Sequence, residues 1–166
     1  MSVPRETEER SLNMGYILDL RKEVGHRPII IPGAAVLFIN EKNEILLHER
    51  ADNGFWGYPG GSMEFGETFE DTARREAFEE SGLICDELEF FDTESGEETH
   101  YTYPHGDEIY VAGILYICRK YHGELKVQEE EVVQQRFFAE DALPSPMDPM
   151  NERFIKKAFQ YVKDHK

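Results

Sequence analysis

The chain has 166 residues with 34 acidic and 18 basic side chains, which gives a formal net charge of −16 at pH 7. This charge excludes a nucleic-acid surface that neutralises phosphates with clustered lysine and arginine. The length predicts one domain over residues 1–166, and the polar start and the lack of a long apolar run predict a cytoplasmic protein without a membrane span. The two cysteines, Cys85 and Cys118, are far apart and predict free, packed thiols.

The first part of the chain predicts a short helix followed by strands. Apolar residues recur at helical spacing before Gly25, so we expect an amphipathic helix over about 12–25. Apolar and β-branched runs predict strands over 29–31, 34–39 and 45–48, with turn residues at 40–43. The two runs on either side of that turn are expected to form a hairpin.

The middle of the chain predicts a well-bounded helix. Thr68 and Asp71 have the spacing of a capping box, and Gly82 is placed to end a helix in the left-handed conformation, which predicts a helix over 69–81. Further strands are predicted over 88–91, 109–119 and 132–138, with a carboxy-terminal helix over about 151–163. Strands and helices mixed in this order indicate an α/β fold with a mixed sheet between helical layers.

Three carboxylates are predicted to lie on one side of the central helix. Glu76 and Glu80 are one turn apart and Glu79 lies beside them, so the three side chains repel one another. The helix carries only two cations, Arg74 and Arg75, and its acidic pair falls in the sector that would otherwise face the core. Three carboxylates supply hard oxygen ligands but do not fill an octahedral coordination shell. Such a set suits Mg²⁺ or Mn²⁺, with waters and substrate phosphates as further ligands.

Residues 61–83, GSMEFGETFEDTARREAFEESGL, resemble the signature of the Nudix hydrolase family of MutT-like enzymes. Every fixed glycine, glutamate and arginine of that signature matches, and only Ala77 is smaller than the aliphatic residue usual at its position. The preceding Trp56 to Gly60 also resembles the tryptophan and Pro-Gly-Gly approach of the family. The resemblance implies a Nudix α/β/α sandwich with a mixed β-sheet.

The resemblance further implies a reaction, the Mg²⁺-dependent hydrolysis of a phosphoanhydride linked to a nucleoside diphosphate. Glu76, Glu79 and Glu80, with the main-chain carbonyl of Gly60, are expected to hold the metal, and Mn²⁺ is the expected substitute. Arg75 is expected to orient these carboxylates, with a plain surface ion pair as the alternative.

The residues offer two sources for the general base. Glu80 is the first candidate, and its rival is Glu130 or one of the neighbouring acids, Glu129 and Glu131. Glu67 is expected to position the loop and the helix rather than to bind metal.

Candidates for substrate contact are Arg50, Trp56, Tyr58, Gly61 and Tyr101. Arg50 resembles the arginine that some relatives turn toward a phosphate, although an ordinary surface arginine fits equally well. Trp56 and Tyr58 have rings that can stack on a nucleobase, but large aromatics in a sheet protein are more often core residues. Gly61 lets backbone approach a phosphate closely, and Tyr101 either lines a pocket or only belongs to a hairpin. Each histidine is interpreted as structural.

The sequence leaves the substrate open. Among relatives, a proline shortly after the signature indicates ADP-ribose, and a tyrosine slightly further indicates dinucleoside polyphosphates. Tyr101 lies eighteen positions after Leu83, and the first such proline, Pro104, comes later. Dinucleoside polyphosphates, nucleoside triphosphates and ADP-ribose are therefore all candidates. The alternative is a catalytically silent Nudix-like module that binds a nucleotide or a partner protein. We expect a small nucleotide as partner, no nucleic-acid polymer and no membrane, and an open oligomeric state with a homodimer as one option.

Overall fold

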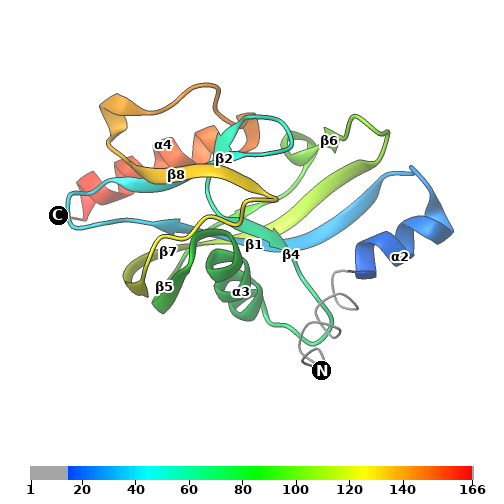
Figure 1. Ribbon diagram of the computed structural model, residues 1–166, viewed down its shortest axis with the longest axis horizontal. Coiled ribbons are helices and arrows are strands. Elements are labelled where there is room, and N and C mark those ends of the chain that lie inside the picture. The colour runs from blue at the N-terminus through cyan, green and yellow to red at the C-terminus, as the bar shows by residue number, and fades with distance from the viewer. Residues whose placement is uncertain (1–14, 166) are drawn as a thin grey trace.

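The computed structural model of the protein describes residues 15–165 (Figure 1). Its helices are α2 (Gly15–Val24), α3 (Phe69–Ser81) and α4 (Pro149–Asp164), with 3₁₀ turns at Glu97–Thr99 and Glu140–Ala142. Its strands are β1 (Ile29–Phe38), β2 (Ile45–Arg50), β3 (Trp56–Gly57), β4 (Gly60–Ser62), β5 (Leu83–Glu94), β6 (Tyr101–Thr102), β7 (Glu108–Gly123) and β8 (Val132–Phe138).

The strands form two sheets. The larger has the order β4–β1–β7–β5 with β6 also paired to β7, and the smaller has the order β3–β2–β8. The larger sheet is mixed, because β1 runs parallel to β7 whereas β4 and β5 are antiparallel to their neighbours. A mixed sheet was expected from the order of the elements, and the structure confirms it.

Strand β1 is buried on both faces and supports a helix on each side. Successive side chains of a strand point to opposite faces, so Ala34, Val36 and Phe38 join the core under α3 while Ala35 and Leu37 join the core under α4. Figure 1 shows the two helices on opposite sides of the strands. This layering confirms the α/β sandwich predicted from the sequence.

The predicted hairpin is wrong beyond its tip. Within residues 15–165, β1 and β2 are bridged only between Ile39 and Ile45 and then separate into different sheets. The edges of β1 are occupied by β4 and β7, so β2 pairs with β3 and β8 instead. The two runs predicted on either side of Pro32 form one strand, because β1 pairs with β7 in an unbroken register from Ile29 to Phe38. The Pro32 carbonyl still accepts the Met63 N–H at 2.9 Å.

Helix α3 begins and ends at the predicted residues. The Thr68 side chain accepts the Asp71 N–H at 3.1 Å, and the Asp71 side chain accepts the Thr68 N–H at 2.9 Å. Gly82 ends the helix with a φ of 82° and donates its N–H to the Phe78 carbonyl. Local signals at both ends therefore fix this helix.

Loss of the cap should weaken α3 by a modest amount. Thr68→Ala removes the oxygen that accepts the Asp71 N–H, and we expect the free energy of unfolding to fall by about 1 kcal/mol. Urea denaturation followed by circular dichroism measures the change. Thr93→Ala, at an exposed position of β5, is the matched control and should change stability far less. An equal loss in both variants would show that the cap contributes nothing specific.

The remaining boundaries differ from the predictions by a few residues. β5 begins at Leu83 rather than 88, because Gly82 turns the chain and Leu83 pairs at once with Gly123. α4 begins at Pro149, where the Asp148 side chain accepts the Met150 N–H at 2.8 Å. Positions 12–14 of the predicted first helix lie outside the described residues.

Two further expectations concern the cysteines and the membrane. Cys85 and Cys118 are free and buried, as predicted. Among the helices of residues 15–165, none combines the length and the apolar character that crossing a bilayer requires.

Candidate active site

The acidic face of α3 lies directly against β4. A Cβ on Gly61 would come within 2.4 Å of the Glu76 carboxyl carbon, and one on Gly60 would come within 2.6 Å of the Ala35 Cβ. The Gly60 N–H donates to Oε2 of Glu80 at 3.0 Å. Only glycine leaves room for this contact, so the two glycines place the strand backbone on the helical carboxylates.

Arg75 holds the helical carboxylates from the side. Its Nη1 group lies 2.8 Å from Oε1 of Glu76 and 3.3 Å from Oε2 of Glu79. Its Nη2 group donates to the Ser62 carbonyl at 2.9 Å, which ties the helix to β4. These contacts exceed a plain surface ion pair, and the orienting role expected of Arg75 stays a prediction.

Glu67 is the second anchor of Arg75. Its two carboxylate oxygens accept from Nε and Nη2 of Arg75 at 2.5 and 3.0 Å. It also accepts the Thr72 hydroxyl at 2.7 Å and the Glu64 N–H at 3.0 Å. All of these contacts fix the loop before α3 to the helix.

The electrostatics of the face favour a cation. Burial, reinforced by Glu79, raises the pKa of Glu76 to about 7 against the opposing effect of Arg75. Burial and then the charge of Glu76 raise the pKa of Glu80 well above its usual value. Buried carboxylates become easier to ionise when a cation offsets their charge. Oxygen donors of this kind fit Mg²⁺ or Mn²⁺.

The three carboxylates share one side of α3 without meeting at one point. Glu76 and Glu79 turn an oxygen to Arg75, and Glu80 turns one to the Gly60 N–H. Accordingly, no group of three acidic, histidine or cysteine side chains in the described part of the chain encloses a common point. The three carboxylates thus lie on one side of α3, but their oxygens do not point to a common centre. Binding a metal would require these oxygens to turn.

The raised pKa of Glu76 predicts how stability depends on pH. An unfolded glutamate ionises near pH 4.5, whereas folded Glu76 keeps its proton up to about pH 7. Metal-free folded protein therefore loses stability as the pH rises through this range, by on the order of 3 kcal/mol for this group. Glu76→Gln should gain stability relative to the unsubstituted protein by that amount between about pH 5 and pH 8 in chelator.

Comparing the two proteins at each pH cancels the titration of groups that the charge of Glu76 does not affect, including His48. Glu80 is the exception, because the charge of Glu76 contributes to its raised pKa. Millimolar Mg²⁺ should reverse the order, because only the glutamate form gains a ligand bond. Urea denaturation at several pH values, with chelator or with Mg²⁺, measures both effects. Glu70→Gln, at an exposed position of α3, should follow the unsubstituted protein throughout. A pH-independent difference for Glu76→Gln would contradict the assignment.

His48 belongs to this site, although the sequence interpretation took each histidine as structural. It is buried on β2, and its Nδ1 lies 3.9 Å from Oε2 of Glu80. Burial and then the Arg50 charge lower the pKa of His48 to about 4, so it is neutral at pH 7 and forms no ion pair with Glu80. The only signal in the sequence is a histidine that directly follows the apolar run 45–47.

The acidic segment ahead of β8 approaches the site through Glu131. The Glu131 charge contributes to the raised pKa of both Glu76 and Glu80. Burial and then Glu79 raise the pKa of Glu131 itself. All three acids of the segment are exposed, and of the three only Glu131 is among the main contributors to the shifts of the two helical carboxylates. The structure therefore brings Glu131, rather than Glu130, toward the site.

Arg50 ends β2 next to the site and already has acidic partners. Its Nε and Nη2 groups donate to the two oxygens of Asp52 at 3.0 and 2.8 Å, and its Nη1 group lies 4.0 Å from Asp148. The guanidinium remains about a third exposed. A substrate phosphate would have to compete with Asp52 for it.

The aromatic candidates fall into two groups. Trp56 and Tyr58 are 8% and 6% exposed and belong to the core under α4, which favours the packing alternative left open by the sequence. Tyr101 contacts Tyr103 edge to face, with ring centroids 4.9 Å apart, and Tyr103 stacks on His105. Burial raises the pKa of Tyr103, and the charge of Arg50 opposes that shift, so this aromatic hairpin borders the Arg50 side of the site.

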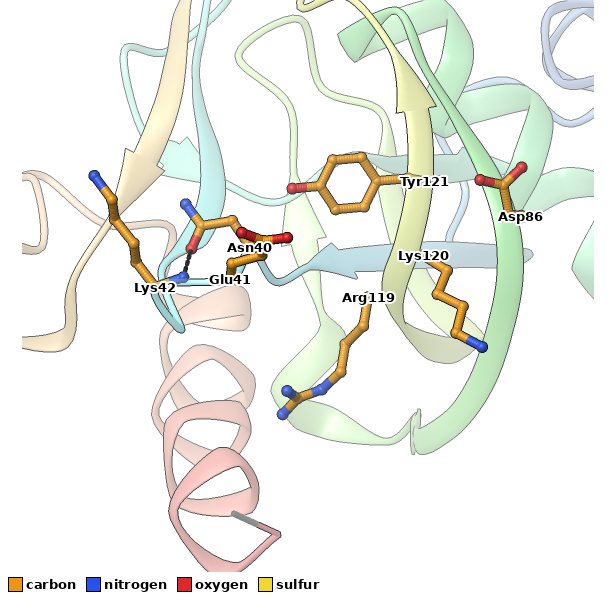
Figure 2. A pocket seen from close by; sticks show the side chains of 7 residues that line it. All are labelled: Asn40, Glu41, Lys42, Asp86, Arg119, Lys120 and Tyr121. Atoms are coloured by element: carbon orange, nitrogen blue, oxygen red, sulfur yellow. Dashed lines mark hydrogen bonds between the residues drawn. The ribbon is translucent and has the colours of Figure 1, made fainter.

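A separate hollow of about 550 Å³ lies at the β1–β2 turn (Figure 2). It is lined by Asn40, Glu41, Lys42, Asp86, Arg119, Lys120 and Tyr121. Figure 2 shows the three basic side chains pointing in different directions, and Lys120 is paired with Glu87 at 2.9 Å. These cations do not converge on one anionic group, and no residue of the α3–β4 site lines the hollow.

Comparison with known proteins agrees with this geometry. Mouse (Mus musculus) 8-oxo-dGDP phosphatase NUDT18 is 27% identical over 117 residues, which covers 67% of this chain and 33% of that protein. NAD-capped RNA hydrolase NudC from Haemophilus influenzae strain PittGG is 27% identical over 135 residues, covering 78% of this chain and 47% of that protein. The chain thus spans between a third and a half of the length of these curated relatives.

The fold has close counterparts among solved structures. The crystal structure of the MutT NUDIX hydrolase from Burkholderia pseudomallei matches with a TM-score of 0.65 and 22% identity, covering 81% of this chain and 98% of that one. A family model described as the NUDIX domain matches residues 30–158, a range that includes α3, β4 and the acidic segment before β8. The chain therefore belongs to the Nudix family.

Proposed function

We propose that the protein is a metal-dependent pyrophosphohydrolase that cleaves the phosphoanhydride bond of a nucleoside diphosphate linked to another group. The observation that carries this proposal is the close approach of Gly60 and Gly61 to the carboxyl groups of partly buried Glu76 and buried Glu80, beside Arg75. A strand backbone, anionic oxygens and one fixed guanidinium then border the same small volume. The names of the two curated relatives, which describe a phosphatase of 8-oxo-dGDP and a hydrolase of NAD-capped RNA, support a nucleotide substrate.

We assign the helical residues to the metal. Glu76, Glu79, Glu80 and the Gly60 carbonyl would hold Mg²⁺, or Mn²⁺ in its place. Bound metal supplies a Lewis acid for the diphosphate and lowers the pKa of a water molecule. Arg75 is itself held by Glu67 and the Ser62 carbonyl, and it keeps the carboxylates on the side of α3 from which they would turn to the metal.

For the general base we propose Glu80, with the acidic segment before β8 as its rival. Glu80 is buried, and one of its carboxylate oxygens accepts the Gly60 N–H while the other is free to act on a water molecule. Within the rival segment, the charge effects described above favour Glu131 over the expected Glu130.

On the substrate side we propose Arg50, Gly61 and Tyr101. Arg50 keeps exposed surface next to Asp52, and Tyr101 belongs to the aromatic hairpin on that side of the site. Trp56 and Tyr58 would support the turn from the core rather than stack on a base.

A substrate panel tests the proposal. Purified protein is incubated with ADP-ribose, diadenosine polyphosphates and nucleoside triphosphates in Mg²⁺, and the nucleotide products are separated and measured by anion-exchange chromatography. We expect turnover of at least one class that is lost in chelator and restored by Mn²⁺. Absence of turnover for the whole panel, together with measurable nucleotide binding, would favour the silent binding module instead.

A further inference from the structure

His48 and Gln135 face each other across the smaller sheet and both reach the end of α3. They are register partners on β2 and β8. The Gln135 side-chain amide donates to the Ser81 carbonyl at 3.2 Å, and Nδ1 of His48 lies 3.9 Å from Oε2 of Glu80. Glu80 and Ser81, neighbours at the end of α3, are therefore approached by two paired residues of the smaller sheet.

Both side chains carry a buried polar atom that lacks a partner. Nδ1 of His48 and Oε1 of Gln135 have no hydrogen-bond partner within residues 15–165. Leaving a buried polar atom unpaired costs about 1–3 kcal/mol, so such atoms usually have a ligand-bound or functional state in which they are satisfied. For His48, the nearest carboxylate is the one on Glu80, with which it shares its buried surroundings.

We propose that His48 is a positioning residue for Glu80, donating from Nδ1 to Oε2 when the carboxylate turns toward the metal. The present separation of 3.9 Å exceeds a hydrogen bond by about 1 Å, a distance that a small rotation of either side chain can close. A neutral imidazole offers one N–H donor and one acceptor nitrogen, which suits a carboxylate as partner. Gln135 keeps the end of α3 in place through Ser81 while Glu80 turns.

This inference rests on the proposed metal site and adds a second element to it. Removing a residue that hydrogen-bonds to a metal ligand typically lowers metal affinity by about 10–100-fold. The smaller sheet would then contribute to metal binding without supplying a ligand.

The test measures Mn²⁺ affinity directly, by electron paramagnetic resonance of free Mn²⁺, alongside turnover of the best substrate of the panel. His48→Leu removes both ring nitrogens from a strand where Leu46 and Leu47 are already buried. We expect Mn²⁺ affinity to fall by about 10-fold or more. His48→Asn places an amide donor where Nδ1 stood, and it should restore affinity to within a few-fold. His122→Leu, an exposed histidine on β7 paired with Asp86, should change nothing.

Each outcome decides a different point. Unchanged Mn²⁺ affinity in His48→Leu, or an equal loss in the Leu and Asn variants, would overturn the positioning role. Should His48→Leu not fold, His48→Gln takes its place, because it moves the donor from the δ to the ε position and should bind Mn²⁺ more weakly than His48→Asn. Equal affinity of the Asn and Gln variants would likewise overturn the role. Failure of the unsubstituted protein to bind Mn²⁺ would instead overturn the metal site of the proposed function.

Discussion

Glu80→Gln is expected to lower kcat/KM by on the order of 10³-fold, the range associated with loss of a general base or an acidic metal ligand. The amide oxygen can still accept the Gly60 N–H, so the contact between β4 and α3 remains. Burial raises the pKa of Glu80 well above its usual value, so the charged carboxylate is disfavoured in metal-free protein. By the same linkage as for Glu76, Glu80→Gln should raise stability without metal at neutral pH, because the unfolded glutamate is ionised there. Turnover of the best panel substrate and thermal denaturation in chelator measure the two effects.

The matched control is Glu70→Gln on the exposed side of the same helix, which should retain full turnover. If Glu80→Gln keeps activity within about tenfold, the base lies elsewhere. Glu131→Gln and Glu130→Gln then form a second matched pair. The charge effects on the helical carboxylates predict that only the Glu131 variant loses activity and changes the pH profile of turnover.

Gly61→Ala is expected to disable the site through a single methyl group. Its Cβ would lie 2.4 Å from the carboxyl carbon of Glu76 and 2.6 Å from each carboxyl oxygen, so either the helix or the carboxylate must move. Displacing a catalytic group by about 1 Å can cost on the order of 10²-fold in rate. The atoms that the Cβ would meet are the end of a flexible side chain, so the carboxylate can turn aside at little cost in stability. We therefore expect weaker Mn²⁺ binding and a loss of turnover of that order, with the midpoint in urea little changed.

Gly25→Ala distinguishes this clash from a general effect of replacing glycine. Gly25 has a φ of 65° and nothing within 4 Å of an added Cβ, so the substitution strains the backbone without a collision. It should cost about 1–2 kcal/mol of stability and leave turnover intact. Full activity of Gly61→Ala would mean that Glu76 can leave its position without consequence, and its proposed role as a ligand would fail.

The parts of the fold that the sequence predicted correctly depend on neighbours along the chain. The cap at Thr68 and the left-handed Gly82 are local signals, and they fixed both ends of α3. The hairpin after β1 failed because its outcome depends on β4 and β7, which come from distant positions and occupy the edges of β1. No pattern within residues 29–48 contains that information.

The residues of the candidate site also divide into those that local sequence predicts and those that only the assembled fold brings together. The order of Arg75, Glu76, Glu79 and Glu80 placed all four on one side of α3, because helical spacing alone decides it. His48 could not be linked to Glu80 from the sequence, since thirty-two positions separate them and only the assembled sheets bring them together. Trp56 illustrates a third case, in which the residue type allowed both stacking and burial and only packing against Phe138 decided for burial.

The division of the strands into two sheets separates two kinds of evolutionary change. The glycines that lie on the acidic helix belong to the larger sheet, whereas Arg50 belongs to the smaller one. Apart from His48 and Gln135, which reach Glu80 and Ser81, residues of β2, β3 and β8 can change what approaches the helix without contacting the carboxylates on it. A lineage could therefore exchange one leaving group for another while its acidic motif stays constant. For this reason the motif indicates a type of reaction and not a particular substrate.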